Sequence, residues 1–272
     1  MLKSSDLKNI TMEIKLLLPR SLKRRIKSEL VLCNNVLIGS HHKAGTVWMQ
    51  TIFRDIAKKY RLHMESRNLG DLPPDSYDIY FHSHSDFDFS KIKNRYKGMH
   101  IIRDPRDLIV SATHYHAKSD ESWLHIKRPE FGNMTYHEKI NTYSTFGDQM
   151  LFEMENSSAR EIRSIMNWDY TDKRFLNVHY EELMQDNRLE LFERIFRHLG
   201  FREWHIGWCL MIAYRNSLFS GGVKSQHVRS GKSRQWPEYF KPPHKKRFNE
   251  LFGDVLVLSG YLTGQDDDWD SL

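Results

Sequence analysis

The sequence predicts an α/β fold: a single domain with a central parallel β-sheet flanked by helices and a P-loop-like nucleotide-binding core. Three observations support this fold class. Short apolar runs of strand length alternate with segments of helical periodicity along most of the chain. No internal repeat and no low-complexity linker divides it. The 272 residues, 39% of them hydrophobic, are enough to build one large core.

The predicted strands are short apolar runs followed by turn residues or charges. A strand buried on both faces of a parallel sheet is nearly continuous in apolar residues, as "NNVLIG" is before Ser40. We expect four strands, at 34–40, 77–83, 98–104 and 174–183, the last of which enters a loop.

The predicted helices show apolar spacing of three to four residues and recognisable ends. Val47, Trp48, Ile52, Phe53 and Ile56 share this spacing after a glycine turn. A proline opens the next helix in its first turn, and Gly200 ends an amphipathic one. The expected helices are 45–60, 105–116, 187–200 and 244–261, with Cys209 in a further helix.

Charge and composition bound the rest of the chain. Residues 1–30 are expected to form a basic, partly helical arm, 31–265 the folded domain and 266–272 an acidic tail. The net charge of +6 favours an anionic ligand, and segment 20–27 is a candidate for weak contact with an acidic surface.

No apolar run reaches about 18 residues and no signal peptide pattern begins the chain, so we expect no membrane span and a cytoplasmic location. Cys33 and Cys209 are expected to be reduced core residues, and no cluster has the spacing of a metal site.

The stretch "SHHKAGTVW" is the first candidate anion site. Gly45 permits a tight turn, and the amides of Gly45, Thr46, Val47 and Trp48 would be free donors at a helix N-terminus, where a phosphate is favoured. Lys43 precedes the glycine instead of following it, so the Walker pattern G-x-x-x-x-G-K-[ST] is not met. A plain strand–turn–helix with a surface lysine remains open for this stretch alone.

Two further motifs carry positive charge. Arg103 ends a strand and Ser111 follows eight residues later, two turns into a helix, so both could reach one phosphate. The loop "HVRSGKSRQW" at 227–236 interleaves basic residues with serine and glycine, as an anion nest does. Taken singly, a surface ion pair and a solvated basic loop are the better interpretations of these two motifs.

Together the three motifs resemble those of the sulfotransferases that use 3′-phosphoadenosine 5′-phosphosulfate (PAPS). "KAGTVW" is similar to the family's phosphosulfate loop K-[ST]-G-T-[TN]-W, departing at Ala44 and Val47. The Arg103/Ser111 pair is similar to the family's 3′-phosphate segment. "RSGKSRQW" resembles the late loop R-K-G-x-x-G-x-W, which brings in Arg229, Ser230 and Gly231 and departs at Ser230 and Arg234. The resemblance spans residues 34 to about 240 in the family's order.

The resemblance implies roles for particular residues. Lys43 would reach the oxygen that bridges phosphorus and sulfur, and no metal would be needed. His84 falls where the family has the histidine of K-T-H, which acts as the general base, with His82 in place of the lysine; His82, His114 and His116 are its rivals. Tyr180 would contact adenine, and Ser217 and Phe219 resemble residues that touch the base.

The resulting hypothesis is an enzyme that moves a sulfuryl group from PAPS to a hydroxyl or amine of a small-molecule, lipid or carbohydrate acceptor and releases the bisphosphate PAP. The main alternative is a P-loop nucleotide kinase or triphosphatase. A nucleic-acid-binding module and a binding-only family member are the others. The acceptor and the oligomeric state cannot be inferred from the sequence.

Overall fold

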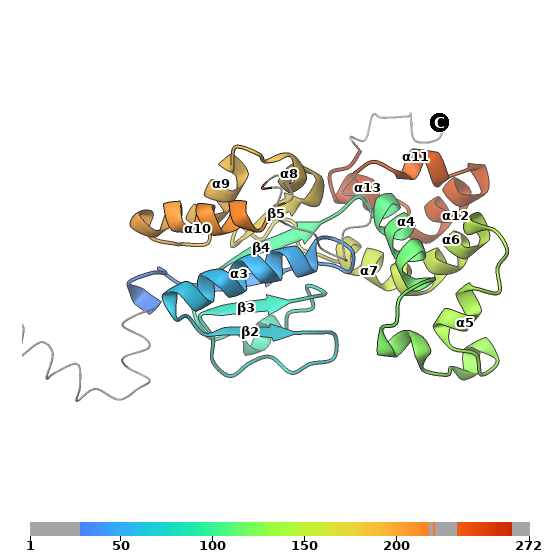
Figure 1. Ribbon diagram of the computed structural model, residues 1–272, viewed down its shortest axis with the longest axis horizontal. Coiled ribbons are helices and arrows are strands. Elements are labelled where there is room, and N and C mark those ends of the chain that lie inside the picture. The colour runs from blue at the N-terminus through green and yellow to red at the C-terminus, as the bar shows by residue number, and fades with distance from the viewer. Residues whose placement is uncertain (1–27, 218–219, 221–232, 263–272) are drawn as a thin grey trace, which may run out of the picture.

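The structure is a computed structural model that describes residues 28–217, 220 and 233–262. Five parallel strands form one sheet in the order β2-β3-β1-β4-β5 (Figure 1). Their bounds are β1 Asn35–Gly39, β2 Met64–Arg67, β3 Ile79–His82, β4 Tyr96–Ile102 and β5 Phe175–His179. The predicted α/β class with a central parallel sheet is therefore confirmed, and β2 is a strand that the sequence pattern did not reveal.

Register brings the carboxyl ends of the strands to one edge. Gly39, the last residue of β1, pairs with His82 of β3 on one side and with His100 of β4 on the other. The next pair along, Ile102 with His179, joins the ends of β4 and β5. The loops that leave these strands therefore meet at the same edge, which is where ligands bind in open α/β sheets.

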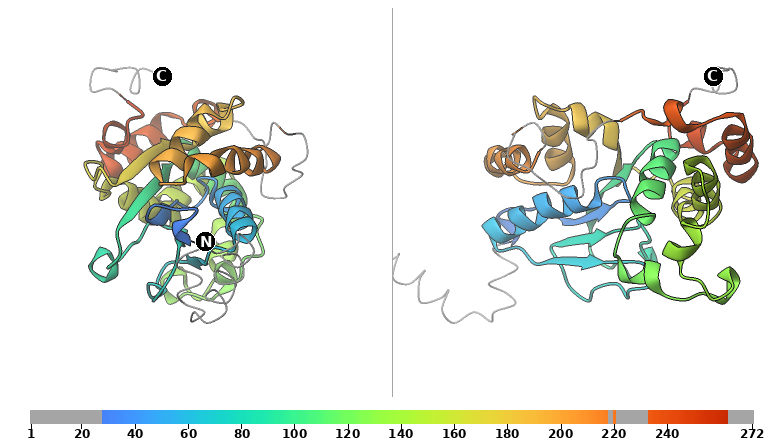
Figure 2. Two further views of the ribbon diagram at one scale, coloured as in Figure 1. Left: turned by 90° about the vertical axis from the view of Figure 1, so that its left-hand side faces the viewer. Right: turned by 45° about the vertical axis from the view of Figure 1, so that its right-hand side comes forward.

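Helices cover the sheet and extend beyond that edge. Their bounds are α3 Thr46–Tyr60, α4 Pro105–His116, α5 Tyr136–Ile140, α6 Phe146–Glu155, α7 Ser157–Met166, α8 Tyr180–Gln185, α9 Glu190–His198, α10 Glu203–Arg215, α11 Trp236–Tyr239, α12 Pro242–Phe252 and α13 Val255–Leu258. Short 3₁₀ turns lie at Phe89–Lys91, Ser122–His125 and Pro129–Phe131. Figure 2 shows α3 running along the sheet, with α4, α6 and α12 grouped past the strand ends.

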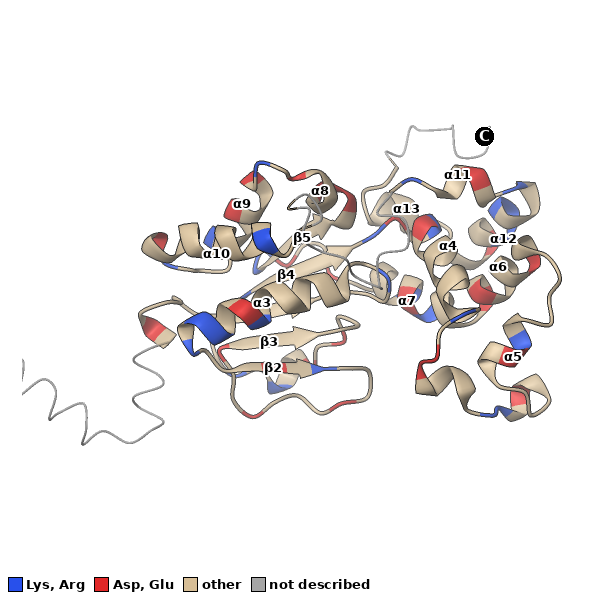
Figure 3. Cartoon of the chain, viewed as in Figure 1, with Lys and Arg blue, Asp and Glu red and all other residues tan. Residues whose placement is uncertain are grey.

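The hydrophobic core has separate parts on the two sides of this edge. One cluster joins the sheet to α3, α9 and α10, and includes Ile38, Phe53 and Phe196. A second joins α4, α6, α7 and α12 to the end of β4 through Ile102. Figure 3 shows that charged residues lie mainly on helices and loops, while the strands contain few of them. The strand ends thus lie between two packed bodies of apolar side chains, which holds their loops in fixed positions.

Several predicted elements differ from the structure. The segment 174–183 is a strand only to His179, because the chain turns at once into α8. The segment 244–261 is broken at Gly253, whose φ of +45° ends α12 before the short α13. Cys209 is buried as expected, but Cys33 is exposed, so its prediction as a core residue is wrong.

None of the helices in the described ranges has both the length and the apolar character that crossing a membrane requires. Most of the predicted arm at 1–30 and the tail at 266–272 lie outside the described residues, and the domain boundaries stay predictions.

Candidate functional site

The loop between β1 and α3 has the geometry of an anion cradle. Two residues in it, Lys43 and Gly45, have left-handed backbone angles, with φ of +65° and +83°. The Ala44 amide donates to the His41 carbonyl at 2.9 Å, which closes a tight turn. Gly45 caps α3, and the first helical hydrogen bond runs from Met49 N to Gly45 O at 3.0 Å. The amides of the first helical turn, from Thr46 to Trp48, therefore remain as donors at the positive end of the helix dipole.

Tyr180 lies directly against this loop. A Cβ atom on Gly45 would be 2.9 Å from both Cδ2 and Cε2 of the Tyr180 ring. The indole of Trp48 meets the same ring edge-on, with centroids 6.4 Å apart. The loop thus needs glycine at position 45 for two reasons, its positive φ and the closeness of the ring.

Arg103 joins the second motif to the first. It follows β4, is 7% exposed, and donates from Nη1 to the Lys43 carbonyl at 2.9 Å. Its guanidinium lies 5.0 Å from the centroid of Tyr180. Arg103 Nε is buried and has no hydrogen-bond partner among the described residues. A buried guanidinium donor without a partner is costly unless a ligand supplies the acceptor, and an anion would do so.

The end of the third motif reaches the same place. Asp107, 3.8 Å from Arg103 Nη2, accepts at Oδ1 from the main-chain amides of Gln235 and Trp236, each at 2.8 Å. Burial raises the pKa of the Asp107 carboxyl, against the lowering effect of Arg103. The Arg106 guanidinium stacks on Trp236 at 3.9 Å. Arg229, Ser230 and Gly231 themselves lie outside the described residues.

The remaining predicted ligand residues are less closely tied to the loop. Ser111 is half-buried on α4, and Val47 is exposed. Ser217 is buried, but its hydroxyl donates locally to the Tyr214 carbonyl at 2.6 Å. Phe219 lies outside the described residues. The contacts that the structure gives for Ser111 and Ser217 do not connect them with the cradle, whereas Val47 belongs to it through its amide.

His84 lies just beyond β3 with a carboxylate behind it. Its Nδ1 is 2.9 Å and 3.1 Å from the two oxygens of Glu161, a residue of α7. An ionised carboxylate only accepts hydrogen bonds, so Nδ1 carries the hydrogen and Nε2 is the remaining nitrogen. The His84 side chain is 18% exposed, whereas that of Glu161 is 2% exposed.

The rival histidines are occupied in other ways. His82 is 2% exposed and its Nδ1 accepts from the amides of His84 and Asp86 at 3.2 Å and 3.3 Å. Burial lowers the pKa of His82 to about 4, so it is neutral near pH 7 and does not replace the charge of the family's lysine. His114 stacks on Phe146 with centroids 4.2 Å apart. His116 is fully buried and pairs through Nδ1 with Glu153 at 2.8 Å.

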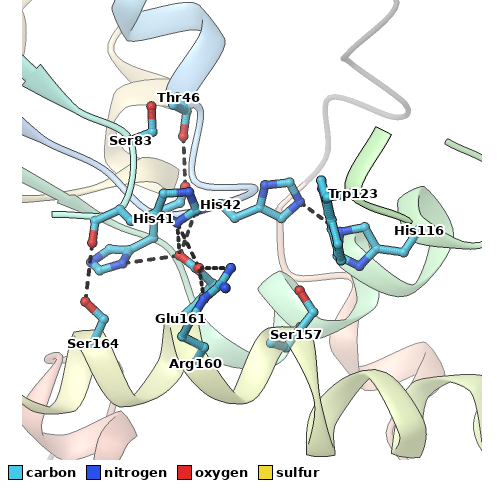
Figure 4. A network of polar contacts seen from close by, with 12 residues as sticks. His41, His42, Thr46, Ser83, His116, Trp123, Ser157, Arg160, Glu161 and Ser164 are labelled. Carbon is cyan, nitrogen blue, oxygen red and sulfur yellow. Dashed lines mark hydrogen bonds and ion pairs between the residues drawn. The ribbon is translucent and has the colours of Figure 1, made fainter. Parts of the chain in front are cut away.

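Glu161 is the site residue that the sequence reasoning missed. Its Oε2 accepts from the His42 amide at 3.1 Å and lies 3.8 Å from His41 Nδ1. Figure 4 shows that the Glu161 side chain points from α7 towards His41 and His42, whereas the His42 ring points away from Glu161 towards His116. Burial alone would raise the pKa of this carboxyl, but His41 and His84 hold it well below its usual range. The available sequence signal was a glutamate on the apolar face of α7, which also carries Ile162 and Ile165.

Comparison with known proteins identifies the family. The sulfotransferase domain model matches residues 77–260, more than half of the chain. The chain therefore belongs to the sulfotransferase domain family, as the three motifs indicated. The match begins after the loop at 40–48, so the assignment is independent of that motif. No curated protein matches the chain.

One solved structure supports the fold, and a second aligns more weakly. The crystal structure of mouse sulfotransferase SULT7A1 complexed with PAP aligns with a TM-score of 0.54 at 18% identity, covering 84% of this chain and 88% of that one. Retinol dehydratase, in complex with androsterone and the inactive cofactor PAP, aligns with a TM-score of 0.48 at 15% identity, over 82% of this chain and 80% of that one.

Proposed function

We propose that the protein transfers a sulfuryl group from PAPS to a hydroxyl or amine of a small-molecule, lipid or carbohydrate acceptor. The observation that carries this proposal is the convergence of the three motifs on one loop. Arg103 bonds the Lys43 carbonyl, Tyr180 closes over Gly45, and Asp107 anchors the end of the late loop beside Arg103. A family member that had lost nucleotide binding would have no reason to keep a buried arginine donor that has no partner among the described residues.

The residues present fit the nucleotide. The first-turn amides of α3 and the ammonium of Lys43 would hold the 5′-phosphosulfate. Arg103 offers a planar fork to the 3′-phosphate, with Ser111 as a second donor. Tyr180 and Trp48 present aromatic surface beside the loop, where the adenine would lie. Ser217, Phe219, Arg229, Ser230 and Gly231 are proposed as further nucleotide contacts, as the family resemblance implies.

The chemistry divides between two side chains. PAPS, when bound, supplies a sulfuryl group on a phosphate leaving group. Nε2 of His84 would accept the proton of the acceptor hydroxyl, whose oxygen would replace the phosphate oxygen on sulfur. The Lys43 ammonium would neutralise the charge on the departing phosphate oxygen, which would be released as part of PAP. No metal enters this scheme.

The Lys43 ammonium lies against an aromatic ring. Its Nζ lies 3.5 Å from the centroid of the Tyr115 ring, on α4. Both residues are half-buried, and a cation–π contact of this kind stabilises by about 0.5–2 kcal/mol, so a charged anion in the cradle can outcompete it. The loop itself need not move, because its left-handed turn is already formed.

Thermal unfolding with added nucleotides tests the proposal directly. PAP should stabilise the protein strongly and ATP with Mg²⁺ little; the opposite order would favour the kinase or triphosphatase. Arg103→Lys should weaken the PAP effect, because lysine cannot form the fork. The matched control is Arg197→Lys, at a surface arginine of α9 that pairs with Glu193. Incubation with labelled PAPS and a mixed acceptor library, read by mass spectrometry, then identifies the product.

A further inference from the structure

The buried glutamate behind His84 contacts two parts of the site at once. Oε1 and Oε2 of Glu161 both face His84 Nδ1, while Oε2 also accepts from the main-chain amide of His42. His42 directly precedes Lys43 in the loop. A single carboxylate therefore links the residue proposed as base to the loop proposed to hold the phosphosulfate.

We propose that Glu161 is a positioning residue that fixes the tautomer of His84 and couples the orientation of its ring to the phosphosulfate loop. The inference rests on the proposed function of His84. A carboxylate that accepts a hydrogen bond from Nδ1–H leaves the lone pair of the ring on Nε2, the nitrogen on the side away from α7. Without that partner the ring could place its hydrogen on Nε2, and the base would lose its acceptor atom.

Burial makes this link strong. Glu161 is 2% exposed, and a buried charge is tolerated only when its hydrogen-bonding capacity is used. Two groups besides His84 use it, the His42 amide at 3.1 Å and the Arg160 side chain at 3.4 Å, and His41 Nδ1 adds an electrostatic contact at 3.8 Å. The partners lie on the loop and on α7 itself, so the carboxylate cannot turn away from His84 without breaking contacts elsewhere.

Other titratable groups around His84 are accounted for. His82 faces it from the end of β3 through the His84 amide, and Asp86 follows in the same turn. His41 lies on the other side of Glu161, and Arg160 adjoins it on α7. Among these described neighbours, Glu161 alone makes a side-chain hydrogen bond to the His84 ring.

The substitution Glu161→Gln separates the two contacts. Glutamine keeps an oxygen that can accept from the His42 amide, but its NH₂ group would donate towards Nδ1 and reverse the tautomer of His84. Glu161→Asp keeps the charge on a shorter stem and should restore the wild-type tautomer in part. Glu153→Gln is the matched control, since Glu153 is equally buried and its carboxylate pairs with His116 instead of His84.

The assay is nitrogen-15 NMR of the histidine rings, which distinguishes the two tautomers without needing an acceptor substrate. The His84 signals are assigned by their loss in His84→Ala. We expect hydrogen on Nδ1 in the wild type and on Nε2 in Glu161→Gln. Glu153→Gln should leave the tautomer of His84 unchanged.

Calorimetric titration with PAP tells the failure of this inference from failure of the proposed function. Glu161→Gln should bind PAP within a few-fold of wild type and turn over about 100-fold more slowly or worse. A wild-type His84 with hydrogen on Nε2, or an unchanged tautomer in Glu161→Gln, overturns the inference even if PAP binds. If wild-type protein does not bind PAP, the proposed function fails, whatever the tautomer of His84.

Discussion

Gly45→Ala tests whether the loop needs glycine because of the Tyr180 ring. Gly45 has a φ of +83°, and a Cβ atom at this position would lie 2.9 Å from two ring atoms. The left-handed angle alone costs a residue with a Cβ about 1–2 kcal/mol. Forcing the extra methyl against a packed ring costs about 1–3 kcal/mol more. The free energy of unfolding should therefore fall by about 2–5 kcal/mol.

Gly70→Ala provides the matched control for backbone strain. Gly70 has nearly the same angle, φ +81°, and no atom lies within 4 Å of the corresponding position. Its substitution should cost only the strain, about 1–2 kcal/mol. The difference between the two variants isolates the contact with Tyr180.

Urea denaturation of both variants, alongside calorimetric titration with PAP, measures the effect. We expect Gly45→Ala to be the less stable variant and to bind PAP more weakly, because the ring or the loop has to shift. The double variant Gly45→Ala/Tyr180→Leu should recover part of the lost stability. Equal losses for Gly45→Ala and Gly70→Ala would refute the claim that the ring dictates glycine in the loop.

Two further predictions concern charge. Lys43→Ala should lower turnover about 100-fold or more while PAP affinity falls only several-fold, since the ammonium acts mainly on the leaving oxygen; near-normal turnover in a steady-state assay would assign that role elsewhere. The pKa of His82, about 4 in the folded protein against about 6.5 unfolded, means that the unfolded chain binds more protons between these values. The contribution of neutral His82 to the free energy of unfolding is therefore present above about pH 6.5 and is lost as pH falls, by about 2 kcal/mol at about pH 5. His82→Asn, which keeps an acceptor for the His84 and Asp86 amides, should lose less stability between about pH 7 and pH 5 in urea titrations; a slope equal to that of wild type would contradict the assignment.

Local sequence signals were enough to predict the elements whose conformation depends on the residue types within one segment. The strand before Ser40, the left-handed turn at Gly45 and the helix opened by Pro105 all follow from residue types that restrict φ or alternate in polarity. The two errors in the C-terminal half have the same cause: apolar spacing does not reveal a break. Gly253 ends α12 inside a continuous apolar pattern, and β5 turns into α8 without a glycine or proline.

Side-chain pairs between distant segments could not be predicted in this way. Glu161 lies 77 residues from His84 along the chain, and the two meet only because α7 packs beneath the strand ends. The hydrogen bond from Arg103 to the Lys43 carbonyl likewise depends on β1 and β4 being neighbours. Residue spacing within one segment does not predict contacts between distant segments, whereas the order and register of the strands do.

The neutral histidines around the loop change how it attracts an anion. Burial, together with the nearby charges of His116 and Lys43, lowers the pKa of His42 to about 3, and burial lowers that of His82 to about 4. Neither ring is charged near pH 7, although both lie beside the cradle. Within the described part of the site, attraction therefore depends on the helix amides, Lys43 and Arg103. Because main-chain amides are fixed in direction while ammonium groups are not, this arrangement favours an anion of defined shape over a diffuse one such as a nucleic-acid backbone.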